Sequence, residues 1–156
     1  MNKVKKSFFF ASLVLLTACE CGKKESKTAG IIVDDSTGGS AADFIANAGD
    51  RVFFAFDKSN LSPEAKATLL RQAEWLNKYP DRKILIEGHC DERGTREYNL
   101  GLGERRADAA AKNLLGDGVS GDRVRTISYG KDKPIAAQGT AEEIHQLNRV
   151  AVTVLD

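Results

Sequence analysis

The sequence predicts an α/β sandwich in which helices pack against a four-stranded mixed sheet. Four short segments carry the apolar and β-branched residues typical of strands, and three segments between them carry helix signals. Turn and capping residues separate neighbouring segments, and the resulting order is βαβαβαβ. This alternation of strands and helices is the pattern from which α/β folds are built.

The first strand is predicted at residues 51–56, "RVFFAF", whose side chains alternate so that Val52, Phe54 and Phe56 share one face. A helix should follow, because Ser62 is a favoured N-cap residue and Pro63 suits the first helical position. Its apolar side is formed by Leu69, Ala73 and Leu76, and Tyr79-Pro80 ends it.

The second strand is predicted at residues 83–88, "KILIEG", and the second helix from about 97 to 115. Gly116 and Gly118 should stop this helix, since glycine is common just past a helix C-terminus. The third strand is predicted at residues 124–130, "VRTISYG".

A short third helix should begin near Thr140, because Thr140 and Glu143 have the spacing of a capping box. The last strand is predicted at residues 150–155, "VAVTVL", in which valines alternate.

An export signal occupies residues 1–18. Three lysines precede an apolar run at residues 8–16, which is too short to cross a bilayer as a helix. The following "LTAC" resembles a bacterial lipobox, which predicts that Cys19 is acylated and becomes the mature N-terminus. The alternative is an ordinary cleaved signal at which Cys19 merely happens to lie. Cys21 is a weaker candidate, because Glu20 would occupy a position that requires a small residue.

Residues 19–48 are rich in Gly, Ser, Lys and Asp and contain only scattered apolar side chains, so they are interpreted as a flexible tether. Residues 49–156 then form one folded domain, and the 42% apolar content of the chain is sufficient for a single core.

Charge and cysteine content limit the function. Removing residues 1–18 takes away three lysines and no acid, so the formal charge changes from +1 to −2 and nucleic-acid binding is not expected. With Cys19 acylated, Cys21 and Cys90 are either free or paired with each other. The preferred interpretation of Cys90 is a small buried apolar group at a strand end.

The loop "GHCDERGTREYN", residues 88–99, joins the second strand to the second helix. His89 and Asp91 can share a face, but Cys90 points the other way, so three ligands do not converge on one metal ion. His145, the other histidine of the chain, has no spacing that brings it to this loop. Adjacent residues rarely reach the geometry of a Cys–His nucleophilic pair either. The sequence therefore predicts neither a metal ion, nor a cofactor, nor a catalytic centre.

A binding site for a charged head group fits these residues better. Asn99, Leu102 and Arg106 lie at i, i+3 and i+7 of the second helix and so share a face, while Asp91 stands at the entrance to the same loop and can therefore lie near Arg106. A carboxylate beside a guanidinium matches the ammonium and carboxylate of an amino-acid head group. A plain surface salt bridge between Asp91 and Arg106 is the alternative.

The stripe of this helix that packs on the sheet is a separate set of residues: Leu100, Gly103, Ala107, Ala110 and Leu114. Asp91 and Arg106 lie outside that stripe. The fold is therefore expected to survive their replacement by alanine.

The segments "GHCDERGTREYNLGLGERRADA", "SYGKDKP" and "NRVAV" resemble the peptidoglycan-associated lipoproteins of the OmpA-like peptidoglycan-binding family. The resemblance runs from about residue 51 to the C-terminus and extends to the lipobox and tether. It implies non-covalent binding of the diaminopimelate unit of a peptidoglycan stem peptide. By this likeness Asp91 and Arg106 are the principal clamp, and the contributing residues are Asn99, Leu102, Phe56 and Asp57.

Two positions depart from the family pattern. Threonine is usual where this chain has Cys90, which removes a hydroxyl group from that position. Two adjacent arginines are usual where it has Arg149-Val150, which puts in doubt any contact made by the second arginine.

The resemblance implies a lipoprotein, not an enzyme, that ties the outer membrane to peptidoglycan within the Tol-Pal system and supports envelope integrity and cell division. Glu20 in place of aspartate after Cys19 favours the outer membrane, on its periplasmic face. TolB is the implied protein partner, through a surface that overlaps the peptide site. Two alternatives are a lipoprotein scaffold that binds only proteins and an envelope hydrolase.

Overall fold

The structure is a computed structural model that describes residues 39–137 and 141–156. Four strands form one sheet in the order β1-β4-β2-β3. β2 and β3 are parallel, whereas β4 runs antiparallel to both of its neighbours. The mixed four-stranded sheet predicted from the sequence is therefore confirmed. The strands are β1 (Arg51–Phe53), β2 (Ile84–His89), β3 (Val124–Gly130) and β4 (Val150–Leu155).

Two long helices alternate with these strands as predicted. α2 (Pro63–Lys78) begins after Ser62, whose hydroxyl accepts a hydrogen bond from the backbone N–H of Ala65. α3 (Arg96–Gly116) begins after Thr95 and extends one residue beyond the predicted range at each end. A single 3₁₀ turn, Gly121–Arg123, leads into β3.

α4 (Glu142–Asn148) is the short third helix expected before the last strand. Ala141 occupies its N-cap position and makes no side-chain capping bond. Thr140, the predicted partner of Glu143 in a capping box, lies outside the described residues.

The first strand is shorter than predicted. It ends at Phe53, which pairs with Val150 at the start of β4. The chain before Val150 is α4, so residues 54–56 have no neighbouring strand with which to extend the ladder. The backbone N–H of Phe54 still donates to Arg149 O at 2.8 Å, after which the chain leaves the sheet.

The tether interpretation is wrong for residues 41–48. Residues 41–47 form helix α1 (Ala41–Asn47), which buries Phe44 to 1% exposure. Phe44 packs edge-on against Trp75 of α2, and the Trp75 indole N–H donates to Asp43 Oδ2 at 2.7 Å. One aromatic contact and one partly buried hydrogen bond hold a helix that a composition-based interpretation cannot detect. Residues 1–38, which carry the predicted signal, Cys19 and the rest of the tether, lie outside the described residues.

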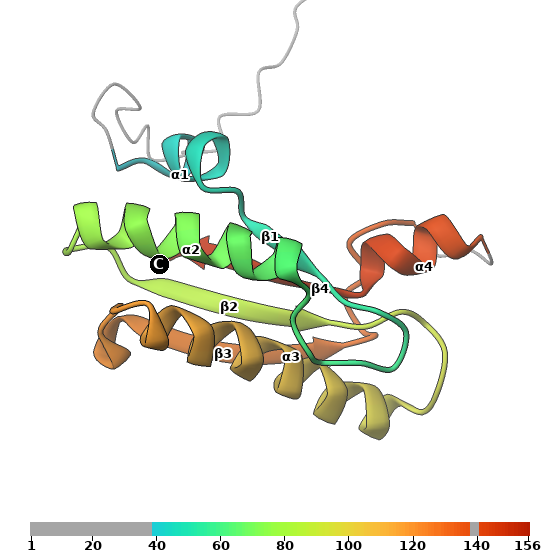
Figure 1. Ribbon diagram of the computed structural model, residues 1–156. Helices are drawn as coiled ribbons and strands as arrows, with labels where there is room; N and C mark the ends of the chain where they lie inside the picture. The colour runs from blue at the N-terminus through green and yellow to red at the C-terminus, as the bar shows by residue number, and fades with distance from the viewer. Residues whose placement is uncertain (1–38, 138–140) are drawn as a thin grey trace, which may run out of the picture. The chain divides into compact units, whose positions relative to one another are not determined.

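The core lies between the sheet and helices α2 and α3, which cover one face of it (Figure 1). α3 buries Gly103, Ala107, Ala110 and Leu114, as its predicted stripe requires. The prediction that Leu100 belongs to this buried stripe is wrong, because 49% of the residue is exposed. It lies against Gly130 at the end of the edge strand β3, where no further strand covers its side chain.

Several connections gather at one end of the sheet, where β1, β2 and β3 end and β4 begins. The loops after these three strands and the helix α4 lie there (Figure 1). Groups from four separate chain segments therefore meet at this end. Within the described parts of the chain, no helix has both the length and the hydropathy that a membrane span requires.

Candidate functional site

A cavity of about 220 Å³ opens at this end of the sheet, and we call it the Asp91 pocket. The structure brings all six residues named from the sequence to its wall, although they come from three separate segments. Four further residues complete the lining, two of them charged or phenolic side chains that sequence reasoning had not selected. The lining residues are Phe56, Asp57, Cys90, Asp91, Arg93, Gly94, Tyr98, Asn99, Leu102 and Arg106.

Arg106 lies at the base of the pocket and is fully buried. Its Nε donates to Lys58 O at 2.9 Å, its Nη1 to His89 O at 2.8 Å, and its Nη2 to Ala55 O at 3.3 Å. Its Nη1 also contacts the Cys90 sulfur at 3.4 Å. A guanidinium has five N–H donors, so within the described chain one N–H is left without a partner. Burial lowers the pKa of Arg106 from its ordinary value.

Two expectations for Arg106 are therefore corrected. It does not lie outside the core, because it is fully buried and joins the loop after β1 to the end of β2. Nor does it pair with Asp91, since the hydrogen bonds that it makes to described residues go to other acceptors. The helix face was assigned correctly, but the segments that cover that face come from distant parts of the chain.

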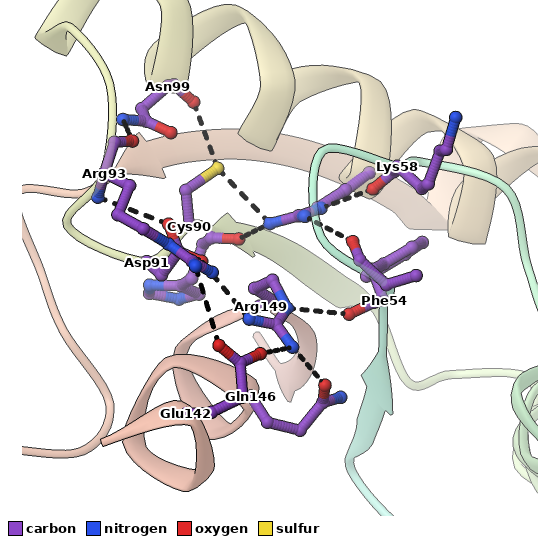
Figure 2. A network of polar contacts seen from close by, with 12 residues as sticks. Phe54, Lys58, Cys90, Asp91, Arg93, Asn99, Glu142, Gln146 and Arg149 are labelled. Carbon is purple, nitrogen blue, oxygen red and sulfur yellow. Dashed lines mark hydrogen bonds and ion pairs between the residues drawn. The ribbon is translucent and has the colours of Figure 1, made fainter. Parts of the chain in front are cut away.

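Asp91 is 4% exposed and is held by two other arginines (Figure 2). Arg93 donates to Asp91 Oδ2 from Nη2 at 2.5 Å and from Nε at 3.2 Å, and Arg149 donates to the same oxygen from Nη1 at 3.3 Å. Burial raises the pKa of the Asp91 carboxyl, but the hydrogen bonds from Arg93 and Arg149 outweigh it, so the pKa lies below its ordinary value. Asp91 is therefore a buried anion at neutral pH.

Arg149 was named from the sequence only for its neighbour Val150, and its contact with Asp91 was missed. It is 3% exposed, its Nε donates to Phe54 O at 3.2 Å, and its Nη2 binds Glu142 at 2.8 Å and also Gln146. Arg149 thus links Asp91 to the residue that follows β1 and to α4. A sequence signal was present, since an arginine directly before a buried strand has to find an anion or carbonyls nearby.

The rim of the pocket carries the more exposed groups. The Arg93 guanidinium lies over the Phe56 ring, 4.1 Å from its centroid, and Phe56 itself is 55% exposed. The Tyr98 hydroxyl donates to Asp57, which raises the pKa of Tyr98. Asp57 has a φ of 55°, in the left-handed region that aspartate tolerates better than most residues. A ligand entering the pocket therefore meets two aromatic rings, the Arg93 guanidinium and the Asp57 carboxylate first.

Cys90 is buried, as expected, at 3% exposure. Its thiol donates to Asn99 O at 3.3 Å, and burial raises its pKa to about 11. A thiol with that pKa stays protonated at neutral pH and is a poor nucleophile. The Asn99 amide in turn donates to Arg93 O at 2.8 Å and so supports the loop that presents Asp91.

His89 does not join the pocket. Its Nδ1 is 2.9 Å from Lys133 O, and its Nε2 is 3.7 Å from Glu87 without a hydrogen bond. Across residues 39–137 and 141–156, no three His, Cys, Asp or Glu side chains are grouped closely enough to hold a metal ion. The pocket therefore offers a buried carboxylate and a buried guanidinium in separate positions, which is a binding chemistry for a group that carries both charges.

Comparison with known proteins finds similar sequences and structures. The model of the OmpA family matches residues 53–148. The chain is 57% identical to the peptidoglycan-associated lipoprotein of Rhizobium meliloti (strain 1021) over 120 residues, which cover 77% of this chain and 68% of the relative. It is 40% identical to the protein of that name from Haemophilus influenzae (strain Rd), over 97% of this chain and 98% of the relative.

A solved structure shows the same fold. The crystal structure of the peptidoglycan-associated lipoprotein from Burkholderia pseudomallei superposes with a TM-score of 0.66 at 40% identity, covering 69% of this chain and 90% of that one. The C-terminal domain of Helicobacter pylori MotB superposes with a TM-score of 0.64 at 22% identity, which shows the fold alone.

Proposed function

Because the chain belongs to the OmpA family, we propose that it is an outer-membrane lipoprotein that binds peptidoglycan without a covalent bond. Its relatives at 40–57% identity are peptidoglycan-associated lipoproteins. The protein is a binding module and not an enzyme, and it ties the outer membrane to the cell wall on the periplasmic side as part of the Tol-Pal system. In this role it supports envelope integrity and cell division.

The observation that carries the proposal is that Asp91 and Arg106, which do not bind each other, line the same pocket. The free end of a diaminopimelate unit bears one ammonium and one carboxylate on the same carbon. Asp91 is the anion that accepts the ammonium, and Arg106 has one N–H to donate to the carboxylate. Asn99 and Leu102 line the pocket from α3, and Phe56 and Asp57 line it from the loop after β1.

The N-terminal segment completes the proposed arrangement. Cys19 carries the lipid, residues 1–18 are removed, and the chain from residue 19 to about 38 tethers the folded domain to the membrane. A linker of this length has a root-mean-square span of roughly 25 Å if it behaves as a flexible coil. The domain can then reach the peptidoglycan layer beneath the membrane.

We propose that TolB is the protein partner, and that the surface of this chain that binds TolB overlaps the Asp91 pocket. The exposed rings of Phe56 and Tyr98 at the pocket rim favour such an overlap, since aromatic residues are enriched at protein interfaces. A partner that covers the rim competes with the stem peptide.

The test is co-sedimentation of the purified chain with isolated peptidoglycan, with and without TolB. Binding to peptidoglycan that TolB reduces is the expected result. If the chain does not sediment with peptidoglycan but still captures TolB, the protein is a scaffold and the proposal fails.

Calorimetric titration with a diaminopimelate-containing tripeptide tests the pocket itself. Losing one partner of a buried charge pair costs about 2–5 kcal/mol, so Asp91→Asn should lower affinity roughly 30-fold or more. The matched control is Asp132→Asn, which removes the same charge from an exposed carboxylate outside the pocket. Amidation of the carboxylate on the free head group should weaken binding as well, since Arg106 then loses its anion.

A further inference from the structure

The two arginines on Asp91 differ in their freedom to move. Arg149 has a side chain that is 4% exposed, and it is held at once by Phe54 O, Gln146 and Glu142. Arg93 has a side chain that is 37% exposed, and it lines the Asp91 pocket. Arg149 is therefore fixed in position, whereas Arg93 is the cation that a ligand would meet at the Asp91 carboxylate.

Charge balance makes Arg93 a competitor of any cationic ligand. Asp91 already faces the guanidinium groups of Arg93 and Arg149 at 2.5 and 3.3 Å, and Glu142 lies 3.5 and 2.8 Å from the same two groups, so the two anions are already balanced by two cations. A third cation brought to the same carboxylate would be repelled by both guanidinium groups. The ammonium of a ligand can gain the full attraction of Asp91 only if the Arg93 guanidinium moves away.

The surroundings allow the Arg93 side chain to move alone. The backbone of the loop is held independently, by the Asn99 amide on Arg93 O at 2.8 Å and by Lys131 Nζ on Gly94 O at 2.7 Å. A second anion, Glu142, lies 3.5 Å from Arg93 Nη1 and has a side chain that is 64% exposed. Figure 2 shows the Arg93 side chain extending between Asp91 and Glu142. A change of side-chain rotamer can therefore transfer the guanidinium from the buried to the exposed carboxylate.

We propose that Arg93 is a specificity-determining residue of the pocket, an internal cation that a ligand must replace with an ammonium group of its own. This inference rests on the proposed function and extends it. The ammonium of a head group with a free amine neutralises the Asp91 carboxylate after the Arg93 guanidinium has moved away. A head group that has only a carboxylate, or whose amine is acylated, has no cation with which to replace Arg93. Arg93 then stays bound to the Asp91 carboxylate. The pocket thus selects zwitterionic ends over anionic ones.

The test measures affinity for the diaminopimelate-containing tripeptide in Arg93→Gln, using the full chain purified from membranes in detergent. Removal of the competing cation should raise affinity about five-fold, a change that corresponds to about 1 kcal/mol. Arg93→Lys, which keeps the charge, should remain closer to the parent than Arg93→Gln. An unchanged or lower affinity in Arg93→Gln overturns the inference, because a residue that merely supports the loop or contacts the ligand would not increase binding when removed.

The matched control is Arg96→Gln, which makes the same charge change three residues away. Arg96 pairs with Asp132 at 2.7 Å and does not line the pocket, so affinity should stay within two-fold of the parent. An increase equal to that of Arg93→Gln would show a general charge effect and would overturn the inference.

A double variant separates this inference from the proposed function. Arg93→Gln should have no effect in an Asp91→Asn background, because the carboxylate for which arginine and ligand compete is gone. If Asp91→Asn alone binds like the parent, the proposed pocket chemistry fails together with this inference. If Asp91→Asn weakens binding while Arg93→Gln does not strengthen it, only the role of Arg93 is wrong.

Discussion

Replacing Arg106 by alanine should destabilise the fold strongly, in addition to removing the ligand contact that we propose for it. The substitution removes the Arg106 donor from the carbonyl oxygens of Lys58, His89 and Ala55, although Ala55 O still accepts from the backbone N–H of Lys58 at 3.2 Å. Hydrogen bonds from a charged group are worth about 1.5–3 kcal/mol each, and the bond to His89 O is buried where water cannot replace it. The carbonyls of Lys58 and Ala55 are partly exposed and can recover water.

We therefore expect a loss of about 3–5 kcal/mol, with the buried bond and the cavity left by the side chain as its main parts. A domain of this size is stable by roughly 5–15 kcal/mol, so the variant should be close to unfolding. Arg106→Lys should lose less, because an ammonium keeps the charge and part of the hydrogen bonding.

Urea denaturation followed by tryptophan fluorescence measures this directly. Trp75 is the single tryptophan of the chain, and it is 7% exposed in the core. For a urea m-value of about 2 kcal/mol/M, a 4 kcal/mol loss lowers the midpoint by about 2 M. Arg105→Ala is the control, since the neighbouring arginine is exposed and its loss should cost within about 0.5 kcal/mol. A cost below 1 kcal/mol for Arg106→Ala would refute the bracing role.

Three further predictions concern other positions. Burial lowers the pKa of His89, so below about pH 6.5 the unfolded chain binds more protons than the folded chain, and the free energy of unfolding should fall as the pH drops. Urea titrations between pH 8 and 5 should show this fall, and His89→Gln should reduce it. Cys90→Thr should change stability by no more than about 1 kcal/mol, and a native thiol with a pKa of about 11 should resist labelling; rapid native labelling would contradict its burial. Cys19→Ser should yield a chain without lipid, and a mature N-terminus that carries no acyl group in the parent would exclude the anchor.

The local pattern was sufficient to predict most of the sheet and its two long helices. Ser62-Pro63 and Tyr79-Pro80 mark the ends of α2 within a residue, and the alternating valines of β4 mark that strand. These signals operate between neighbours in the chain, through capping bonds and side-chain periodicity, so no knowledge of the tertiary structure is needed to detect them. Helical spacing likewise placed Asn99, Leu102 and Arg106 on one face, and all three line the Asp91 pocket.

What covers each face was decided only by the tertiary structure. The spacing that placed Arg106 beside Asn99 carries no information about Lys58, 48 residues earlier, whose carbonyl binds it. In the same way, Asp91 accepts a hydrogen bond from Arg149, 58 residues later in the chain. The two side chains meet because β2 and β4 pair antiparallel and the end of β2 lies beside the start of β4. α1 depends on Trp75, 32 residues beyond Asp43. Burial and ion pairing depend on contacts between segments distant in the chain, which a local pattern does not contain. The sequence by itself therefore determined most of the elements and the helix face that lines the pocket, and the fold determined which charges meet there.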